Sequence, residues 1–369
     1  MSKTKIKTEV KNLLWFKAHG RCEFEGCNYP LYKNGLTSDK INLSEYAHIV
    51  ADSPNGPRGS ELSAALANDE KNLILLCPKC HKTIDTLPEK YTVEILSEMK
   101  RKHEDRIDKL TDIAEQKQSL VVLYGAKIHT DIIAFNYNDV VRSMFPENYP
   151  TNQSPLSIEL NFSHIDKDEG YWELEKKNLE KKIVREVLPL YNDNSRSISL
   201  FALAPQPLLV YLGTLLNDKY NVKVFQKHRE PNTWSWQEQD DDNQLILHKP
   251  ADASKKPMLV IALSAKAIIK RVEENNADAS IWVLTCAEPH NDMLKSEEQL
   301  KNFRQEVRML MDEINTVSNS QPLHIYMAMP VACAVELGRV RMPKADKKWI
   351  LYDKIQGKEK DIECITIGE

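Results

Sequence analysis

The sequence of 369 residues lacks long hydrophobic runs and lacks a strong excess of charge of either sign. No segment approaches the roughly 18 consecutive apolar residues of a membrane-spanning helix, so we expect no membrane partner. Met1 is followed by a lysine-rich polar stretch instead of an apolar signal segment. That start favours a cytoplasmic protein whose cysteines stay reduced.

Neither end of the chain is strongly basic, although the whole carries a formal net charge of −4. Residues 1–110 contain 18 Lys and Arg against 16 Asp and Glu, and the remainder has an acidic excess. We therefore expect one copy to bind nucleic acid poorly and two paired copies to bind it better. Phosphate contacts would come from local basic patches, for which the candidates are Lys79, Lys82, Lys100, Arg101 and Lys102.

Cysteine is scarce, with seven in the chain, but four of the seven form two close pairs. Cys22 and Cys27 form one pair, and Cys77 and Cys80 form the other. Two such pairs separated by a long loop are typical of a structural Zn²⁺ site with four thiolate ligands. The alternatives are buried free thiols, or disulfides in a secreted protein, and the missing signal segment argues against disulfides. The other three cysteines are scattered, and we expect them to be packed or idle.

The residues between the cysteine pairs include side chains that metal-dependent hydrolysis requires. His48 follows a predicted strand, and an imidazole that titrates near neutral pH can deprotonate an attacking water. His81 and Asp85 are four residues apart on a predicted helix, so both lie on one face. Together they can hold one divalent cation, Mg²⁺ or Mn²⁺, which would stabilise negative charge on a phosphate.

The order of His48, Asn72 and His81 between cysteine pairs resembles the HNH (ββα-metal) nucleases, in the variant that carries a zinc knuckle. The resemblance covers about the first hundred residues and is more specific than a lone histidine. It implies that His48 is the general base and that the Asn72 amide fixes the loop presenting it. It also implies that His81 belongs to the catalytic centre. A turn asparagine before a strand is the simpler interpretation of Asn72.

One position departs from this family pattern. Ala47 precedes the predicted base, where many HNH nucleases have an acidic residue or histidine that ligates the catalytic metal. Glu45 and Asp52 are nearby carboxylates that could replace that ligand. The departure leaves open a zinc-knuckle DNA-binding regulator without nuclease activity. His81 and Asp85 argue against it, since a binding knuckle needs neither.

Other segments complete the predicted nuclease domain. Residues 5–19 predict an amphipathic helix, and residues 88–116 predict a long helix that continues as a connector. Residues 53–60 predict a turn-rich loop with Arg58 at its tip, which could approach a DNA backbone. We therefore expect a zinc-stabilised α+β domain over residues 1–115.

Residues 116–369 alternate short apolar strands with amphipathic helices, which predicts an α/β domain with a doubly wound, mostly parallel sheet. The predicted strands cover residues 120–128, 156–163, 197–204, 222–225, 258–265, 281–286, 323–329 and 349–352.

The second domain contains a short internal repeat. Residues 201–205, Phe-Ala-Leu-Ala-Pro, lead through a predicted helix to Gly213, and residues 326–330, Tyr-Met-Ala-Met-Pro, lead to Gly338 at the same offset. The equal spacing predicts two related Rossmann-like halves at about 116–245 and 246–369. Chance similarity of two strand–proline–helix units is the alternative. Ligands of such sheets gather at the carboxyl ends of strands, beside helix amino termini that suit phosphate.

A polar loop between these halves contains Arg229, Trp234 and Trp236. A guanidinium pairs with phosphate and indole rings stack on bases, so the loop predicts a nucleotide pocket. The alternative that the tryptophans anchor the loop on the core remains open.

The second domain resembles the SAVED sensor domain, which consists of two fused CARF-like halves. The likeness rests on the Ala-Pro-Gln-Pro turn, the Trp-Ser-Trp loop, Ala262-Leu-Ser264-Ala265 and the Met-Pro…Val-Glu-Leu-Gly-Arg ending. The ligand-binding residues that it implies are Pro205, Gln206, Arg229, Trp234, Trp236, Ser264, Ala265 and Pro330.

The coupling of both resemblances makes the chain similar to HNH-SAVED effectors of CBASS antiphage systems. It implies a largely non-specific double-stranded DNA endonuclease that leaves 5′-phosphate ends. It further implies activation by a cyclic dinucleotide such as a cyclic GMP-AMP isomer, made by a partner nucleotidyltransferase, and a homo-oligomer, a dimer that goes to higher order on ligand binding. A constitutive restriction-type nuclease would predict a basic carboxyl-terminal region, and this one is acidic.

Overall fold

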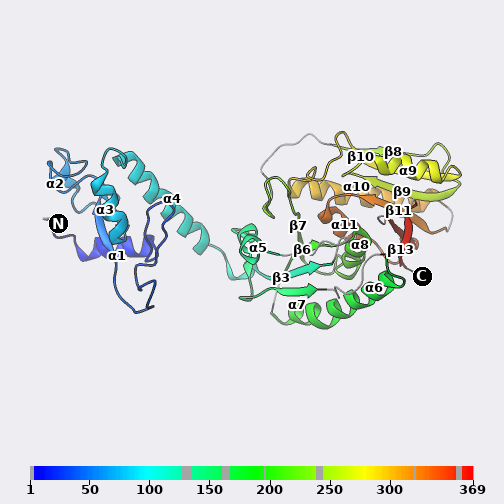
Figure 1. Cartoon of the computed structure of the whole chain (residues 1–369), viewed down its shortest axis with the longest axis horizontal. Helices are drawn as coiled ribbons and strands as arrows, with labels where there is room; N and C mark the ends of the chain where they lie inside the picture. Colours follow the sequence, from blue (N-terminus) through cyan, green and yellow to red (C-terminus); the bar gives the residue numbers. More distant parts are fainter. Residues whose placement is uncertain are drawn as a thin grey trace. The chain divides into compact units, whose positions relative to one another are not determined.

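The computed structural model describes residues 4–126, 135–159, 167–194, 197–237, 244–318, 321–354 and 360–368 (Figure 1). The chain divides into two compact units, Met1–Ala114 and Glu115–Glu369, each with its own core. In the described part of the chain, no helix is long and apolar enough to cross a membrane.

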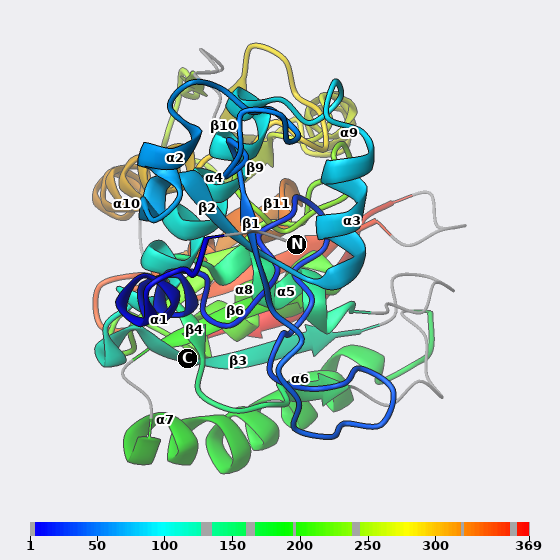
Figure 2. The ribbon, with the colours of Figure 1, turned by 90° about the vertical axis from the view of Figure 1, so that its left-hand side faces the viewer.

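The first unit is a small α+β domain built on an antiparallel pair of strands (Figure 2). In this pair His48 lies opposite Leu73, so the end of the first strand meets the start of the second. The elements are α1 (Thr8–Lys17), β1 (Glu45–His48), α2 (Ser63–Leu66), the 3₁₀ helix η1 (Glu70–Asn72), β2 (Leu73–Leu76), α3 (Pro78–Thr86) and α4 (Val93–Thr111).

Strand β2 is apolar at all four positions and buried at all four. Leu73 packs with Leu14 of α1, while Ile74 belongs to the cluster that contains Ile84 of α3 and Leu96 of α4. A strand with apolar residues on both faces must be covered on both faces, and these helices provide that cover. The core therefore fixes α3, which carries His81 and Asp85, beside β1, which carries His48.

The second unit contains two sheets, and their strands divide between the two halves expected from the sequence, residues 118–225 in the first and 245–367 in the second. In the first sheet every pairing is parallel, whereas the second has antiparallel edge strands on a parallel centre. The first sheet comprises β3 (Gln118–Gly125), β4 (Tyr149–Pro150), β5 (Leu156–Glu159), β6 (Ile198–Leu203) and β7 (Val222–Phe225). The second comprises β8 (Leu245–His248), β9 (Lys256–Ala262), β10 (Ala279–Cys286), β11 (Leu323–Ala328), β12 (Trp349–Asp353) and β13 (Ile362–Ile367).

The α/β character expected from the sequence is confirmed. The ends of two predicted strands, at residues 127–128 and 160–163, lie outside the described residues. The helical elements of this unit are η2 (Glu115–Lys117), α5 (Tyr137–Met144), α6 (Tyr171–Lys182), the π-helix η3 (Ile183–Val187), α7 (Leu188–Asn194), α8 (Gln206–Leu215), α9 (Ala267–Asn275), α10 (Glu297–Val317) and α11 (Val331–Arg339).

Helices α8 and α11 lie between the two sheets and join them into one core (Figure 1). Helix α8, which follows β6 of the first sheet, contacts β12 and β13 of the second. Helix α11, which follows β11 of the second sheet, contacts β6 and β7 of the first. Each half of the unit thus contributes one helix to the other half's sheet.

The two glycines of the internal repeat, Gly213 and Gly338, lie where α8 crosses α11. A Cβ added at Gly213 would stand 2.0 Å from the carbonyl oxygen of Val335, and one at Gly338 would stand 1.9 Å from that of Val210. Each of these carbonyls belongs to the residue three before the opposite glycine, so the contact is reciprocal. Only glycine allows so close an approach of two helix backbones. The equal spacing in the sequence therefore corresponds to a local twofold relation between the two helices.

We expect Gly338→Ala to destabilise the second unit by about 1–3 kcal/mol, because the helices must separate to accommodate the methyl group. Gly213→Ala should cost a similar amount, since the contact is reciprocal. Urea unfolding measures both. Gly125→Ala is the control, because among the described residues its Cβ would meet only the Phe135 ring, at 3.3 Å. Equal stability of Gly338→Ala and Gly125→Ala would contradict the prediction.

Candidate functional site

The four paired cysteines of the first unit converge on one point. Cys22 and Cys27 come from the loop after α1, while Cys77 directly precedes α3 and Cys80 lies in its first turn. Their four Sγ atoms all lie within 4.8 Å of one another. The backbone N–H of Cys77 donates to Cys22 Sγ at 3.3 Å, which ties the loop to the start of the helix.

This cluster fits a tetrahedral zinc ion. Sulfurs bound about 2.3 Å from zinc lie about 3.8 Å apart in a tetrahedron, and Cys27 Sγ is 4.0 Å from Cys77 Sγ. Burial raises the pKa of the Cys22 thiol to about 12, so a cation is needed to hold this sulfur as a thiolate at neutral pH. The thiolate-rich donor set selects zinc over magnesium or manganese.

Asn72 connects the start of β2 to the loop that follows β1. Its side-chain oxygen accepts from the N–H of Val50 at 2.8 Å, and its Nδ2 donates to the carbonyls of Val50 and Leu66 at 2.9 and 3.2 Å. The side chain is almost fully buried, at 6% exposure. Three hydrogen bonds in such a place fix the loop directly after His48.

The His48 ring is oriented by a backbone carbonyl. Its Nε2 lies 3.1 Å from the oxygen of Ala67. A carbonyl only accepts, so Nε2 carries the proton in the neutral ring and Nδ1 holds the free lone pair. Nδ1 is therefore the atom that can take a proton from water.

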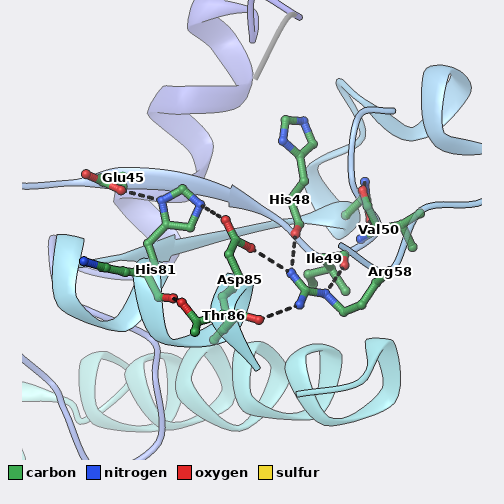
Figure 3. A network of polar contacts seen from close by, with 11 residues as sticks. Glu45, His48, Ile49, Val50, Arg58, His81, Asp85 and Thr86 are labelled. Carbon is green, nitrogen blue, oxygen red and sulfur yellow. Dashed lines mark hydrogen bonds and ion pairs between the residues drawn. The ribbon is translucent and has the colours of Figure 1, made fainter. Parts of the chain in front are cut away.

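The His81 ring lies between two carboxylates, as Figure 3 shows. Its Nδ1 contacts Glu45 of β1, and its Nε2 is 3.3 Å from Asp85 Oδ2 on the same helix face. The hydrogen bond with Asp85 raises the pKa of His81 against the opposing effect of burial, and Glu45 adds to the rise. Two carboxylates that stabilise an imidazolium also form a place where a divalent cation can replace a proton.

The donor set of carboxylate and imidazole fits Mn²⁺ or Mg²⁺. The two carboxylates face opposite nitrogens of His81, so an ion bound through one nitrogen meets only one of them directly. An ion at Nε2 would have Asp85 as its second ligand. Glu45 would then accept from Nδ1–H and orient the ring, as outer carboxylates commonly do for metal-bound histidines.

Glu45, one of the two carboxylates considered in place of the ligand missing at Ala47, lies two residues before that alanine on β1. The alternation of a strand places both on the face toward α3, and Glu45 there reaches His81. Asp52, the other nearby carboxylate, accepts instead from the backbone N–H of Thr4 at 3.2 Å.

Arg58 does not project from its loop toward solvent, which corrects the expectation of an exposed DNA contact. Only 5% of its side chain is exposed. The guanidinium donates to the carbonyls of Ile49 and Ile84 at 2.7 and 2.8 Å, and its Nη2 lies 3.2 Å from Asp85 Oδ1. Its charge thus faces inward.

The basic patch expected on α4 is largely neutralised by acidic neighbours. Lys100 is buried beside Glu104, and Arg101 pairs with Glu98 and Asp105. A helix face of alternating charge explains this run of cations without nucleic acid.

A second candidate site lies at the seam of the two sheets in the second unit. A cavity of about 310 Å³ opens where β6, β7, β9, β11 and β12 end and where α8 and α11 begin. It is lined by Leu203, Ala204, Pro205, Gln206, Gln226, Lys227, Arg229, Ser264, Asn291, Met329, Pro330, Val331, Asp353 and Lys354.

Polar side chains cross this seam. Gln206 Nε2 donates to the carbonyl of Met329 at 3.1 Å, and the N–H of Ala332 donates to Gln226 Oε1 at 3.1 Å. Among the described residues, three cations, Lys227, Arg229 and Lys354, line the cavity together with one carboxylate, Asp353. Excess positive charge beside two helix amino termini suits a ligand with phosphate groups.

The cavity brings together five of the eight residues proposed for ligand binding: Pro205, Gln206, Arg229, Ser264 and Pro330. Ala265 is exposed beyond Ser264, and the lining residues do not include either tryptophan. Trp234 is 3% exposed and packs edge-on against Phe201, so its ring anchors the loop on the core. Trp236 is half-buried against the central core.

Lys227 and Lys354 also line the cavity, but neither is among the ligand-binding residues expected from the sequence. Both follow the end of a strand, β7 or β12, and that position was the available signal.

A family model described as SAVED, "SMODS-associated and fused to various effectors sensor domain", matches residues 179–367. A search of curated proteins found no match.

Among solved structures, the chain is similar to the Cap4 SAVED/CARF-domain receptor of Acinetobacter baumannii with the cyclic trinucleotide 2′3′3′-cAAA. The identity is 14% and the TM-score 0.44, over 83% of this chain and 66% of that one. The Cap4 receptor of Moraxella osloensis shows 12% identity and a TM-score of 0.39, over 78% and 60%. The chain thus spans less than two thirds of the length of these receptors.

Proposed function

The chain belongs to the family of SAVED sensor domains, and we propose that it is a DNA endonuclease activated by a cyclic oligonucleotide. The ligand binds in the cavity at the seam of the second unit. The first unit is an HNH-type nuclease with a structural zinc ion. The observation that carries the nuclease assignment is the His81 ring held between Glu45 and Asp85, because a DNA-binding knuckle needs no such centre.

The chemistry follows from the positions of three side chains, two histidines and one carboxylate. His48, held by the Ala67 carbonyl, takes a proton from the attacking water at Nδ1. His81 and Asp85 would hold Mg²⁺ or Mn²⁺, which supplies stabilisation of charge on the phosphate and on the leaving oxygen. The substrate is double-stranded DNA cut with little sequence preference, leaving 5′-phosphate ends.

The sensor assignment is supported by the cavity's position and charge. Its lining comes from both sheets, and Gln206 and Gln226 bridge the seam. A ligand there contacts both halves at once and can favour one arrangement of the seam over another. Cyclic oligonucleotides, including cyclic dinucleotides from a partner nucleotidyltransferase, carry the phosphate groups that the positively charged lining of this cavity suits.

Activation must be gated, because an always-active nuclease would destroy its own cell. The near-neutral charge of residues 1–110 disfavours DNA binding by one copy. We propose that the ligand drives assembly of protomers, from a dimer to higher order, so that two nuclease units act on one duplex. Sedimentation that shows the same oligomer with and without an activating ligand would contradict this route.

The experiment that tests the proposal combines ligand binding with DNA cleavage. Purified full-length protein is titrated with a panel of cyclic di- and trinucleotides by calorimetry, and the same samples are assayed for plasmid cleavage with Mg²⁺ or Mn²⁺. We expect one ligand to bind and to switch on cleavage. Arg229→Ala should weaken that binding about tenfold or more, since an ion pair with phosphate is lost.

Arg142→Ala is the matched control for this titration, because Arg142 is 80% exposed and lies outside the cavity lining. Ligand binding without cleavage under any condition would favour the DNA-binding regulator. Equal ligand affinity in Arg229→Ala and the wild type would show that the ligand binds outside this cavity.

A further inference from the structure

Arg58 joins the two elements that carry the proposed nuclease centre. Its Nε and Nη1 donate to the carbonyls of Ile49, just after β1, and Ile84, in α3. Its Nη2 lies between the carbonyl of His48, at 3.4 Å, and Oδ1 of Asp85, at 3.2 Å (Figure 3). The arginine therefore spans the gap between the end of β1 and the last turn of α3.

The surroundings of Arg58 are unusual for a loop arginine. The backbone at Arg58 has φ of +58°, a conformation that residues other than glycine adopt at a cost. Only 5% of its side chain is exposed, and all three guanidinium nitrogens have acceptors. Most acceptors are backbone carbonyls, so the guanidinium holds the positions of two elements and not merely a charge partner.

The contacts of Asp85 divide its carboxylate between two partners. Oδ1 faces Arg58, and Oδ2 faces Nε2 of His81. Holding one oxygen leaves the other aimed at the ring nitrogen where a cation would bind. A carboxylate free to rotate would present this oxygen only part of the time. The entropy lost when the ion fixes that carboxylate would reduce the affinity for the ion.

We propose that Arg58 is a positioning residue that holds Asp85 toward His81 and fixes the last turn of α3 against the strand that carries His48. The inference rests on the proposed nuclease function, because it assigns Arg58 to the divalent cation centre of that nuclease. It also explains why the turn-rich loop of residues 53–60 folds back on the domain.

Two simpler roles make different predictions. If Arg58 acted only through its charge, its removal would strengthen cation binding, because a positive group beside a ligand repels the ion. If it contacted DNA, its removal would weaken DNA binding and leave cation binding unchanged. Positioning predicts weaker cation binding in spite of the favourable change in charge.

The test measures Mn²⁺ binding to zinc-loaded full-length protein by electron paramagnetic resonance, without DNA or activating ligand. We expect Arg58→Met to weaken Mn²⁺ binding about tenfold or more, the usual loss for a partner behind a metal ligand. Arg58→Lys keeps the charge but not the planar fork, and it should lie nearer to Arg58→Met than to the wild type. Arg101→Met is the control, because Arg101 pairs with Glu98 and Asp105 on an exposed face of α4.

Unchanged or tighter Mn²⁺ binding in Arg58→Met would overturn the positioning role and leave the nuclease proposal in place. His81→Ala separates the two proposals. If this variant binds Mn²⁺ as tightly as the wild type, the ion does not bind at His81, and the proposed divalent cation centre is wrong. Zinc content and DNA affinity in chelator-free, Mn²⁺-free buffer are measured for each variant. If Arg58→Met fails to hold zinc, Arg58→Lys carries the test, and wild-type Mn²⁺ affinity in that variant overturns the proposal.

Discussion

We expect His48→Ala to lower ligand-activated DNA cleavage by about 10²–10⁴-fold, the usual contribution of a general base. The structure gives the ring one orientation: Nε2 faces the Ala67 carbonyl at 3.1 Å, which leaves Nδ1 as the proton acceptor. The Asn72 amide fixes the following loop through Val50, so the strand end that carries the ring is also held. Alanine removes the acceptor and retains this backbone framework.

The measurement compares initial cleavage rates at saturating activator and divalent cation. Affinity for the cyclic oligonucleotide and zinc content should equal those of the wild type. His103→Ala is a closely matched control, because His103 is also buried and its Nε2 also lies 3.1 Å from a backbone carbonyl, that of Ala18. An equal loss of activity in both variants would assign His48 a folding role.

Local spacing explains why part of the candidate site could be predicted from the sequence. His81 and Asp85 meet because a helix brings residues four apart onto one face, and the helix itself begins at Pro78 next to two of the cysteines. The cysteine pairs are likewise short-range patterns. Each of these features needs only one element to form correctly.

Long-range packing explains what the sequence did not reveal. The polar loop of residues 53–60 predicted an exposed Arg58, but turn composition says nothing about the direction of a side chain, which here follows from carbonyl acceptors on β1 and α3. Trp234 likewise packs on Phe201 of a distant strand. The equal spacing of Gly213 and Gly338 predicted two related halves, but it did not show that these glycines lie against each other where α8 crosses α11.

Removal of zinc is expected to unfold the first unit and to leave the second folded. The first unit has a small core, and the loop that carries Cys22 and Cys27 is tied to α3 through the cysteine cluster. Binding of structural zinc contributes on the order of 10 kcal/mol in small domains, which exceeds the stability expected of such a core. The second unit has its own core, built on two sheets and the helices between them.

Calorimetry with and without a zinc chelator tests this expectation. Zinc-loaded protein should show a transition for the first unit that the chelator abolishes, and Cys80→Ser should show the same loss. Cys364→Ser is the control, because Cys364 lies in the second unit, apart from the cluster. Retention of the first transition after chelation would mean that the four cysteines act as buried thiols.

The chelated protein also separates sensing from cleavage. Since the described residues that line the cavity at the seam all belong to the second unit, affinity for the cyclic oligonucleotide should persist when the first unit has unfolded. Cleavage should be lost at the same time, because β1 and α3 then no longer hold His48 near His81 and Asp85. If the chelated protein instead loses affinity for the cyclic oligonucleotide, ligand binding by the second unit requires the folded first unit. Activation would then act through that coupling between the two units.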